Sequence, residues 1–338
     1  MFRTEEIFDA LLDRAVNGDG KAQLFGEPAE TENRALLHEK LCGRPFSMLF
    51  LEVPLTGKPG FDLHVIHNSE AIRRGVPFSD GVYGGRGRLF SWFASENWGS
   101  AGLDVVYDLR EGWAVPPMVY LKSCNEMSGI CGGFFRNAGV EEAAARFREK
   151  RALLPAGWLP WYTGVHTGRR GKPLRIGSLL SDELKNRYAG NIRLFEADLG
   201  KAGFPVPFSP VVRDRLQTLF RFPFPIDVQM DVTEDGRVSD LLGISLTTGD
   251  IGRDALAASF AGGAAGDAMR LWTSWGIADG RWRLLPAATF ARSSILRSAD
   301  SDQRRFILSA TVGYLKVRFR GTGSSASDAK AYIRLQAR

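Results

Sequence analysis

The chain has 338 residues, of which 44% are hydrophobic and 24% are charged, the composition of an ordinary globular protein. Its formal net charge of +6 favours an anionic partner, whether nucleic acid, a membrane surface or a phosphorylated small molecule. The three cysteines form no CxxC pair, the N-terminal segment lacks the apolar core of a signal peptide, and no stretch reaches the roughly 18 apolar residues of a membrane span. These features exclude a disulfide framework and a zinc ribbon, and we expect a cytoplasmic protein without a membrane span.

Extended runs come in pairs along the chain, and a short turn-rich segment joins the two runs of each pair. The pairs are 45–53 with 61–67, 102–110 with 118–123, 161–167 with 173–179, 224–232 with 238–246, and 307–319 with 329–336. A parallel crossover needs a dozen or more residues, so these short connections predict antiparallel hairpins. The sequence thus predicts five hairpins, of which the third is the least regular because of Pro160 and Gly164.

Helical patterns lie before and between the hairpins, at 4–17, 33–42, 86–97, 139–152, 181–199, 209–221 and 253–275. Ser181 is followed by two acidic residues and Ser209 by a proline, and both are typical helix N-caps. No low-complexity linker divides the chain. We therefore predict a single domain that spans residues 1–338.

The predicted strands alternate between an apolar face and a polar face. On the polar faces, tyrosine is followed two residues later by lysine or arginine in three strands. These pairs are Tyr120 with Lys122, Tyr314 with Lys316, and Tyr332 with Arg334. A face in contact with water normally mixes Thr, Ser, Glu and Lys, so the repeated pair argues against simple solvation, although half-exposed strands remain an alternative.

Ten antiparallel strands with intervening helices fit an open sheet, two small domains or a closed barrel. A barrel removes both sheet edges, and its outer apolar face is then covered by the helices. We predict an α+β fold: a ten-stranded antiparallel β-barrel of five hairpins surrounded by α-helices. The polar faces of the strands then line a lumen wide enough for a ligand.

A lumen lined by tyrosine and basic residues suits one kind of substrate in particular. Lysine and arginine on neighbouring strands provide the donors that a phosphate or diphosphate needs. Each tyrosine face attracts a cation by about 0.5 to 2 kcal/mol. Together they suit a molecule that separates into a diphosphate anion and a carbocation, as an allylic prenyl diphosphate does.

The repeated helix and hairpin units, with Lys, Arg and Tyr alternating into a lumen, resemble the ABBA aromatic prenyltransferases, whose fold is the PT barrel. Locally, GLDVVYDLREGWAVPPMVYLK is similar to the second hairpin of the cyanobactin peptide prenyltransferases, where an arginine and then a lysine grip the diphosphate. RPFSMLFLEV resembles the first barrel strand of the same family. The topological likeness covers most of the chain, whereas the sequence likeness covers these two segments.

The resemblance implies roles for twelve residues. The implied diphosphate ligands are Arg110, Lys122, Arg175, Lys316, Arg318 and Arg334. The implied shield of the carbocation is Tyr120, Tyr314 and Tyr332. Glu52 lies where related indole prenyltransferases place the acid that binds the acceptor and removes its proton, unless the strand has the other register, with Ser47, Leu49 and Leu51 inside. Asp62 and Asp227 are the reserve bases.

By the same resemblance, the donor is dimethylallyl, geranyl or farnesyl diphosphate, and the acceptor is a Trp or Tyr side chain in a peptide or a free indole or phenol. No cofactor is required by the sequence, and Mg²⁺ could arrive with the diphosphate. We expect a monomer. Two other classes stay open: a barrel that binds an anionic apolar ligand without reaction, and a binder of single-stranded nucleic acid, which no RNP-like or KH-like motif supports.

The remaining motifs predict no metal site of the protein's own. His64 and His67 fall on opposite faces of one strand, so we expect these two and His166 to be structural or solvent-facing. The run DVTEDG resembles the start of a calcium loop, but Leu242 stands where the bidentate acid must be. Cys124 and Cys131 are expected to pack in a loop.

Overall fold

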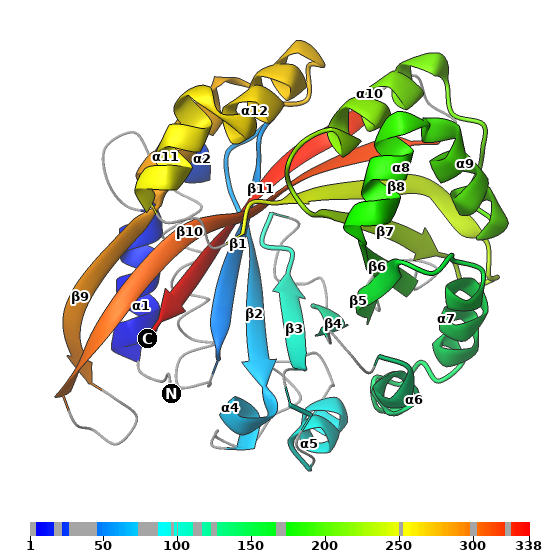
Figure 1. Cartoon of the computed structure of the whole chain (residues 1–338). Coiled ribbons are helices and arrows are strands. Elements are labelled where there is room, and N and C mark those ends of the chain that lie inside the picture. Colours follow the sequence, from blue (N-terminus) through cyan, green and yellow to red (C-terminus); the bar gives the residue numbers. More distant parts are fainter. Residues whose placement is uncertain are drawn as a thin grey trace.

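The computed structural model describes residues 5–16, 22–26, 46–73, 87–95, 98–99, 101–110, 117–122, 127–166, 174–249, 253–297, 303–321 and 326–338. Ten antiparallel strands close into a barrel, because β11 pairs with β1 on one side and with β10 on the other (Figure 1). The strands are β1 (Met48–Pro54), β2 (Asp62–Asn68), β3 (Gly102–Tyr107), β4 (Met118–Lys122), β5 (Trp158–Val165), β6 (Leu174–Leu180), β7 (Ile226–Val232), β8 (Val238–Thr247), β10 (Gln303–Arg320) and β11 (Ala326–Ala337). The predicted ten-stranded antiparallel barrel of five hairpins is confirmed.

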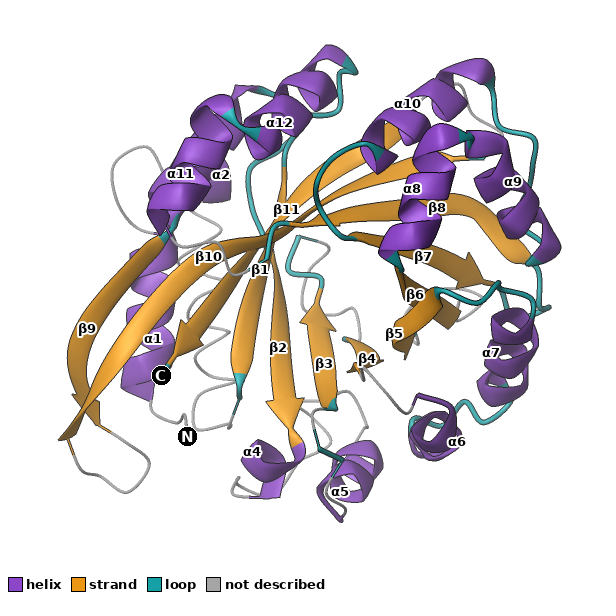
Figure 2. Ribbon diagram, viewed as in Figure 1, coloured by secondary structure: helices purple, strands orange, loops and turns teal. Residues whose placement is uncertain are grey.

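Helices surround the barrel on its outer side, as Figure 2 shows. They are α1 (Glu5–Val16), α2 (Ala22–Phe25), α4 (Ser69–Arg73), α5 (Gly87–Ser95), α6 (Met127–Asn137), α7 (Ala143–Ala152), α8 (Asp182–Gly190), α9 (Ile192–Lys201), α10 (Pro210–Phe220), α11 (Arg253–Gly262), α12 (Ala264–Ser274) and the 3-10 helix η1 (Gly280–Ala288). None of these described helices combines the length and apolar character needed to cross a membrane.

Where the structure describes the predicted helices, helices lie at the expected positions, but three details differ, and α2, α4, α6 and η1 were not predicted. The helix expected at 181–199 is divided at Asn191, whose backbone is extended and whose side chain caps α9 by accepting from the Arg193 amide at 3.1 Å. The helix expected at 253–275 is divided at Gly263, because its extended backbone breaks the helix. Cys131 lies in α6 and not in a loop. Residues 33–42 and Cys124 lie outside the described residues.

The last hairpin is longer than expected, and an eleventh strand extends it. The first half of β10 pairs with β9 (Phe290–Arg297), whereas its second half pairs with β8. A bulge between Val312 and Tyr314 shifts the alternation, so that Leu308 and Leu315 are buried on the same side of the strand although an odd number of positions separates them. Strand β9 was missed because the sequence FARSSILR does not alternate between apolar and polar residues.

The outward faces of the strands and the inward faces of the helices form the core. Leu315, Val317 and Phe319 of β10 and Ile333 and Leu335 of β11 are completely buried in it. Each such side chain contributes about 1.5 to 3 kcal/mol relative to exposure. Because these five residues face the helices, the polar faces of the same strands point into the lumen.

Candidate active site

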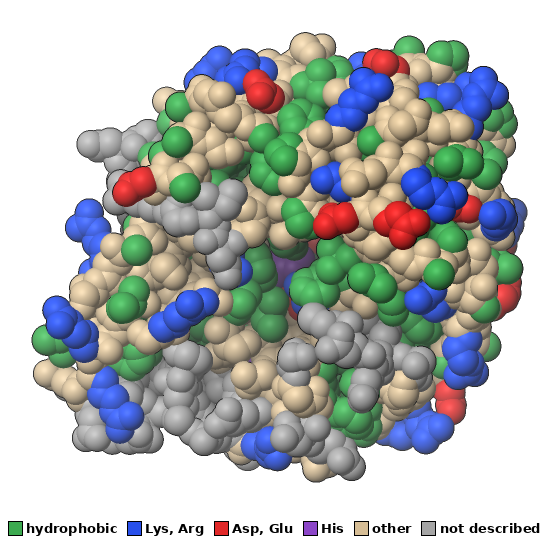
Figure 3. All heavy atoms as spheres, in the orientation of Figure 1, with side chains coloured by type: hydrophobic (Ala, Val, Ile, Leu, Met, Phe, Trp, Pro, Cys, Tyr) green, Lys and Arg blue, Asp and Glu red, His purple; other side chains and the backbone are tan. Residues whose placement is uncertain are grey.

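The barrel encloses a cavity of about 990 Å³, the size of a small-molecule site. Figure 3 shows a hollow near the centre of one face, bordered by hydrophobic side chains, with a histidine visible inside it. Each barrel strand contributes to the wall, mostly at alternate positions. The wall includes Phe50, Glu52, Asp62, His64, Asp104, Arg110, Met118, Tyr120, Lys122, Tyr162, Arg175, Asp227, Gln229, Ser245, Thr247, Tyr314, Lys316, Arg318, Asp328, Lys330, Tyr332 and Arg334.

Two glycines on the inner face of the barrel make room for tyrosine rings. Gly164 is the partner of Tyr120 on the neighbouring strand, and a Cβ atom at Gly164 would lie 2.0 Å from the ring. Gly177 lies beside Tyr162 in the same way, with a Cβ position 2.2 Å from the ring. The two tyrosine rings meet edge to face, with centroids 5.9 Å apart. Gly164, which made the third hairpin look irregular, therefore has a packing reason.

Glu52 is the centre of one hydrogen-bond network in the cavity. Its Oε2 accepts from the Tyr332 hydroxyl at 2.6 Å and lies 3.2 Å from Nε2 of His64, and its Oε1 accepts from the Lys330 ammonium. Burial alone would raise the pKa of Glu52, but Lys330 and His64 outweigh it and hold the pKa well below its usual value. Glu52 is therefore an ionised carboxylate in a buried site.

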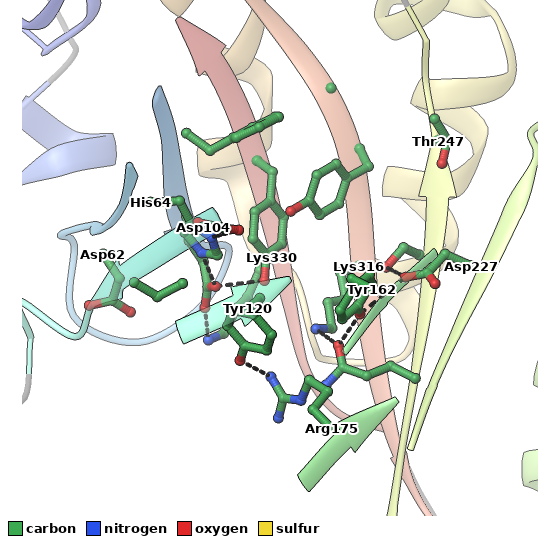
Figure 4. Close-up of a pocket in the computed structure, with 18 of the residues that line it drawn as sticks. Asp62, His64, Asp104, Tyr120, Tyr162, Arg175, Asp227, Thr247, Lys316 and Lys330 are labelled. Atoms are coloured by element: carbon green, nitrogen blue, oxygen red, sulfur yellow. Dashed lines mark hydrogen bonds and ion pairs between the residues drawn. The ribbon is translucent and has the colours of Figure 1, made fainter. Parts of the chain in front are cut away.

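His64 continues this network to a second carboxylate. Its Nδ1 lies 3.1 Å from Oδ2 of Asp104 (Figure 4). The same oxygen lies 2.7 Å from the Lys122 ammonium. Burial by itself lowers the pKa of His64, but the two flanking carboxylates outweigh it and raise the pKa to about 9. Lys122 and His64 overcome the burial of Asp104 and lower its pKa to about 2. At neutral pH, His64 is thus an imidazolium between two carboxylates.

Aromatic rings lie directly beside these charges. Tyr314 and Tyr332 stack with centroids 4.0 Å apart, and Phe50 lies 5.7 Å from Tyr314. The Lys122 ammonium is 5.2 Å from the centroid of Phe50. Burial raises the pKa of both tyrosines well above the usual value, so both remain neutral phenols. Their electron-rich faces form a continuous aromatic surface in the lumen.

Two partners hold Arg175 in place. Its guanidinium forms a two-point ion pair with Asp231 at 2.7 and 2.8 Å, and its Nη1 donates to the Tyr120 hydroxyl at 3.1 Å. That hydroxyl also lies 3.0 Å from Nε2 of His166. The ion pair has the planar geometry that arginine favours. Arg175 is therefore rigid.

Lys316 has a neutral hydrogen-bond partner: it donates to the amide oxygen of Gln229 and forms no ion pair with a described carboxylate. Burial and the nearby Arg175 lower the pKa of Lys316 to about 7. The Tyr162 hydroxyl lies 2.9 Å from the same Gln229 oxygen and 3.3 Å from Oδ2 of Asp227. Ser245 donates to Oδ2 of Asp227 at 3.3 Å, and burial raises the pKa of Asp227 to about 6.

Three further cations line the cavity. Arg110 pairs with Asp62, Arg318 pairs with Asp328, and Arg334 donates weakly to a threonine hydroxyl at 3.4 Å. Among the described residues the wall carries seven lysines and arginines and six aspartates and glutamates, besides His64. The positive charge is thus largely balanced, which the sequence did not predict. An anion in the lumen must compete with carboxylates for its cations.

All twelve candidate residues from the sequence line this one cavity. Leu49 and Leu51 are buried in the outer core, so the other register of the first strand is excluded and Glu52 points into the lumen. His64, expected to be structural or solvent-facing, is buried and lies between two carboxylates on the wall of the cavity, so it does not face the solvent. Sequence reasoning also missed Asp104, Tyr162, Gln229, Asp328 and Lys330. Of these, Asp104, Gln229 and Lys330 could have been found, because they occupy alternate positions on the polar faces already recognised.

No metal centre is evident in the part of the chain that the structure describes. There, His, Cys, Asp and Glu side chains nowhere gather in a group of three or more that could hold a metal ion. Two carboxylates of the wall already have cation partners, since Asp62 pairs with Arg110 and Asp104 with Lys122.

The comparisons with known proteins show the fold. No family model and no curated protein matches the sequence. The chain is similar to a solved structure of the prenyltransferase PriB in its apo form, with 15% identity, a TM-score of 0.55, and coverage of 99% of this chain and 96% of that chain. A structure of PriB in a binary complex with product diphosphate gives 16% identity, a TM-score of 0.53 and the same coverage. The barrel ringed by helices is therefore the fold of the ABBA prenyltransferase structures, whereas no sequence comparison supports closeness to the cyanobactin enzymes.

Proposed function

We propose that this protein transfers a prenyl group from an allylic isoprenoid diphosphate to an aromatic acceptor. The observation that carries the proposal is the stacked pair of Tyr314 and Tyr332, which lies on the wall of one cavity together with the ionised Glu52 and several cations. This wall has donors for an anion, neutral π faces for a carbocation and a carboxylate for a proton. The same fold in a prenyltransferase crystallised with product diphosphate adds support.

The diphosphate binds among the basic residues of the lumen, and Lys316 is the first of them. Its ammonium has a neutral hydrogen-bond partner, so an anion can bind it without displacing a carboxylate. Burial and the nearby Arg175 lower its pKa, and a bound diphosphate would stabilise the protonated ammonium. Arg110, Lys122, Arg175, Arg318 and Arg334 complete the anion site.

The reaction begins when the allylic C–O bond breaks and its electron pair remains on the diphosphate. The basic residues stabilise the charge on this leaving group in a largely enclosed lumen. The tyrosine faces of Tyr120, Tyr314 and Tyr332 shield the allylic cation. An electron pair of the acceptor ring then forms the new C–C bond, and the ring proton passes to Glu52, which restores aromaticity.

The acceptor is an electron-rich aromatic ring. We propose a Trp or Tyr side chain in a peptide, and a free indole or phenol is the close alternative. Glu52 is the preferred base, because it is ionised and lies at the stacked tyrosines, whereas burial without a cation partner raises the pKa of Asp227. No cofactor takes part in these steps, and Mg²⁺ enters only as a counter-ion of the diphosphate.

The direct test is incubation of the protein with dimethylallyl, geranyl or farnesyl diphosphate and a set of Trp and Tyr peptides and free indoles. Mass spectrometry should detect an acceptor heavier by one prenyl group. Binding of a thiolodiphosphate analogue, which does not ionise readily, is measured in parallel by calorimetry. Binding without any transfer would identify a non-catalytic barrel for an anionic ligand. Absence of both binding and transfer would refute the proposal.

A further inference from the structure

In the described part of the chain, Asp227 lacks the ion pair that four other carboxylates of the cavity form. Glu52, Asp62, Asp104 and Asp328 each form an ion pair with a lysine or arginine of the wall. No such cation partners Asp227 among the described residues. Its Oδ2 accepts from Ser245 at 3.3 Å and lies equally far from the Tyr162 hydroxyl, while its Oδ1 is buried and has no hydrogen-bond partner.

A buried carboxylate oxygen without a partner is rare, because its desolvation is not compensated. The side chain is only 5% exposed, and burial raises its pKa to about 6, so the group is still mostly ionised at neutral pH. Asn at this position would avoid the penalty and keep the shape. Asp227 also lines the cavity, so its carboxylate borders a ligand in the lumen without an ion pair of its own.

The surroundings of Asp227 favour a ligand with several hydrogen-bond donors. Ser245 is the partner of Asp227 in the register of β7 and β8, and Thr247, two residues further along β8, also lines the cavity. A primary ammonium has three donors and no acceptor, which matches a carboxylate with hydroxyls beside it. A diphosphate would be repelled by the carboxylate, and a metal ion would need further acidic or histidine ligands.

We propose that Asp227 binds a primary ammonium group of the acceptor, so that the preferred acceptor is an aromatic amine or the N-terminal aromatic residue of a peptide. This inference rests on the proposed function. Strands β7 and β1 lie on different sides of the barrel, with β8, β10 and β11 between them on the shorter path. An acceptor held by its ammonium at Asp227 therefore reaches across the lumen and presents its ring toward Glu52.

The test compares tryptamine with 3-ethylindole, which has the same ring and no amine, by calorimetric titration in the presence of a thiolodiphosphate analogue. A charge-assisted hydrogen bond in such a site is worth a factor of roughly 10 to 100 in affinity. Wild type should prefer tryptamine by that factor. In Asp227→Asn, which keeps the shape of the side chain, the preference should fall to within about threefold while the affinity for 3-ethylindole is unchanged.

A proton count separates direct binding from a structural role. An ammonium beside Asp227 lowers the pKa of the carboxyl, so binding of tryptamine near pH 6 should release a proton, measured as a dependence of the heat on the buffer. 3-Ethylindole should release none. The matched control is Asp108→Asn, which removes a carboxylate of the same wall that has no role in the proposed reaction and should retain the preference for tryptamine.

Two peptide arms identify the source of the ammonium. The affinity for a short peptide with a free N-terminal tryptophan is compared with the affinity for its N-acetylated form. Tryptamine represents a small aromatic amine in the same comparison. Equal affinity of wild type for tryptamine and 3-ethylindole, or an unchanged preference in Asp227→Asn, would overturn this inference even if both acceptors are prenylated. Absence of transfer to every acceptor, with no binding of the thiolodiphosphate, would instead overturn the proposed function.

Discussion

Tyr314 and Tyr332 stack across neighbouring strands, with ring centroids 4.0 Å apart and an angle of 20° between the ring planes. They are direct partners in the register of β10 and β11, so the contact follows from the pairing of the two strands. The Tyr332 hydroxyl donates to Glu52, and the ring of Tyr314 also contacts Phe50, with centroids 5.7 Å apart. The pair joins the carboxylate of the site to its aromatic surface.

Replacement of Tyr314 separates the role of the ring from that of its hydroxyl. Tyr314→Phe should keep kcat/KM within about threefold, because the π face remains. Tyr314→Leu should lower it by about tenfold, since the lost cation–π attraction is about 0.5 to 2 kcal/mol. Affinity for the thiolodiphosphate should change little in both, measured by calorimetry. Equal losses in the two variants would argue against a cation shield.

Glu52→Gln tests the carboxylate as the base. The amide keeps the size of the side chain and cannot take a proton, so kcat should fall by about 100-fold or more. Thiolodiphosphate binding should be retained, because Glu52 is not part of the anion site. Steady-state and binding measurements on the same preparation decide this. If Glu52→Gln turned over at the rate of wild type, another carboxylate would have to be the base.

The charge on His64 should stabilise the fold below pH 9. The pKa of His64 is about 9 in the folded protein and 6.5 ordinarily, so its contribution is complete below pH 6.5 and is lost as the pH rises through 9. That shift corresponds to about 3 kcal/mol. Urea unfolding of wild type and His64→Gln should therefore differ by roughly that amount at pH 6 and much less at pH 9.5. Lys316 contributes to the stability of both proteins at each pH, so its opposite pH dependence cancels from the difference between them. A difference in the free energy of unfolding that stays constant with pH would contradict the raised pKa of His64.

Diphosphate binding should weaken as the pH rises above 7, because Lys316 has a pKa of about 7 in the empty site and must gain a proton to pair with the anion. The dissociation constant of a thiolodiphosphate should rise by up to about tenfold per pH unit until the pKa of the complex is reached. In Lys316→Arg the side chain stays charged at every pH tested, and any titration of the ligand itself affects wild type and variant equally. Its dissociation constant should stay nearly flat above pH 7, and a slope equal to that of wild type would exclude Lys316.

Strand alternation was sufficient to predict the barrel and the lumen-facing side of Lys122, Lys316 and Tyr332. It needs only the period of two and a buried outer face. The ion pairs could not be predicted in the same way, because Arg175 and Asp231 meet through the register of two strands that belong to different hairpins. Tyr162 was missed since a bulge between Pro160 and Tyr162 interrupts the alternation. Local pattern therefore predicts which face of a strand is polar, while partners depend on strand register.

The fit of Tyr120 over Gly164 gives a prediction for stability and site geometry together. In Gly164→Ala the new methyl group would lie 2.0 Å from the Tyr120 ring, so the ring must move away from Arg175 and His166. Overpacking of this kind costs typically 1 to 3 kcal/mol. Gly129→Ala is the matched control, because its Cβ position in α6 meets nothing within 4 Å and alanine favours the helix by about 0.5 to 1 kcal/mol. Urea unfolding should show a loss for Gly164→Ala and none for Gly129→Ala, and thiolodiphosphate binding should weaken in the first variant alone. Full stability in Gly164→Ala would mean that the strand can move apart from Tyr120, and the close contact would then not be what fixes this ring.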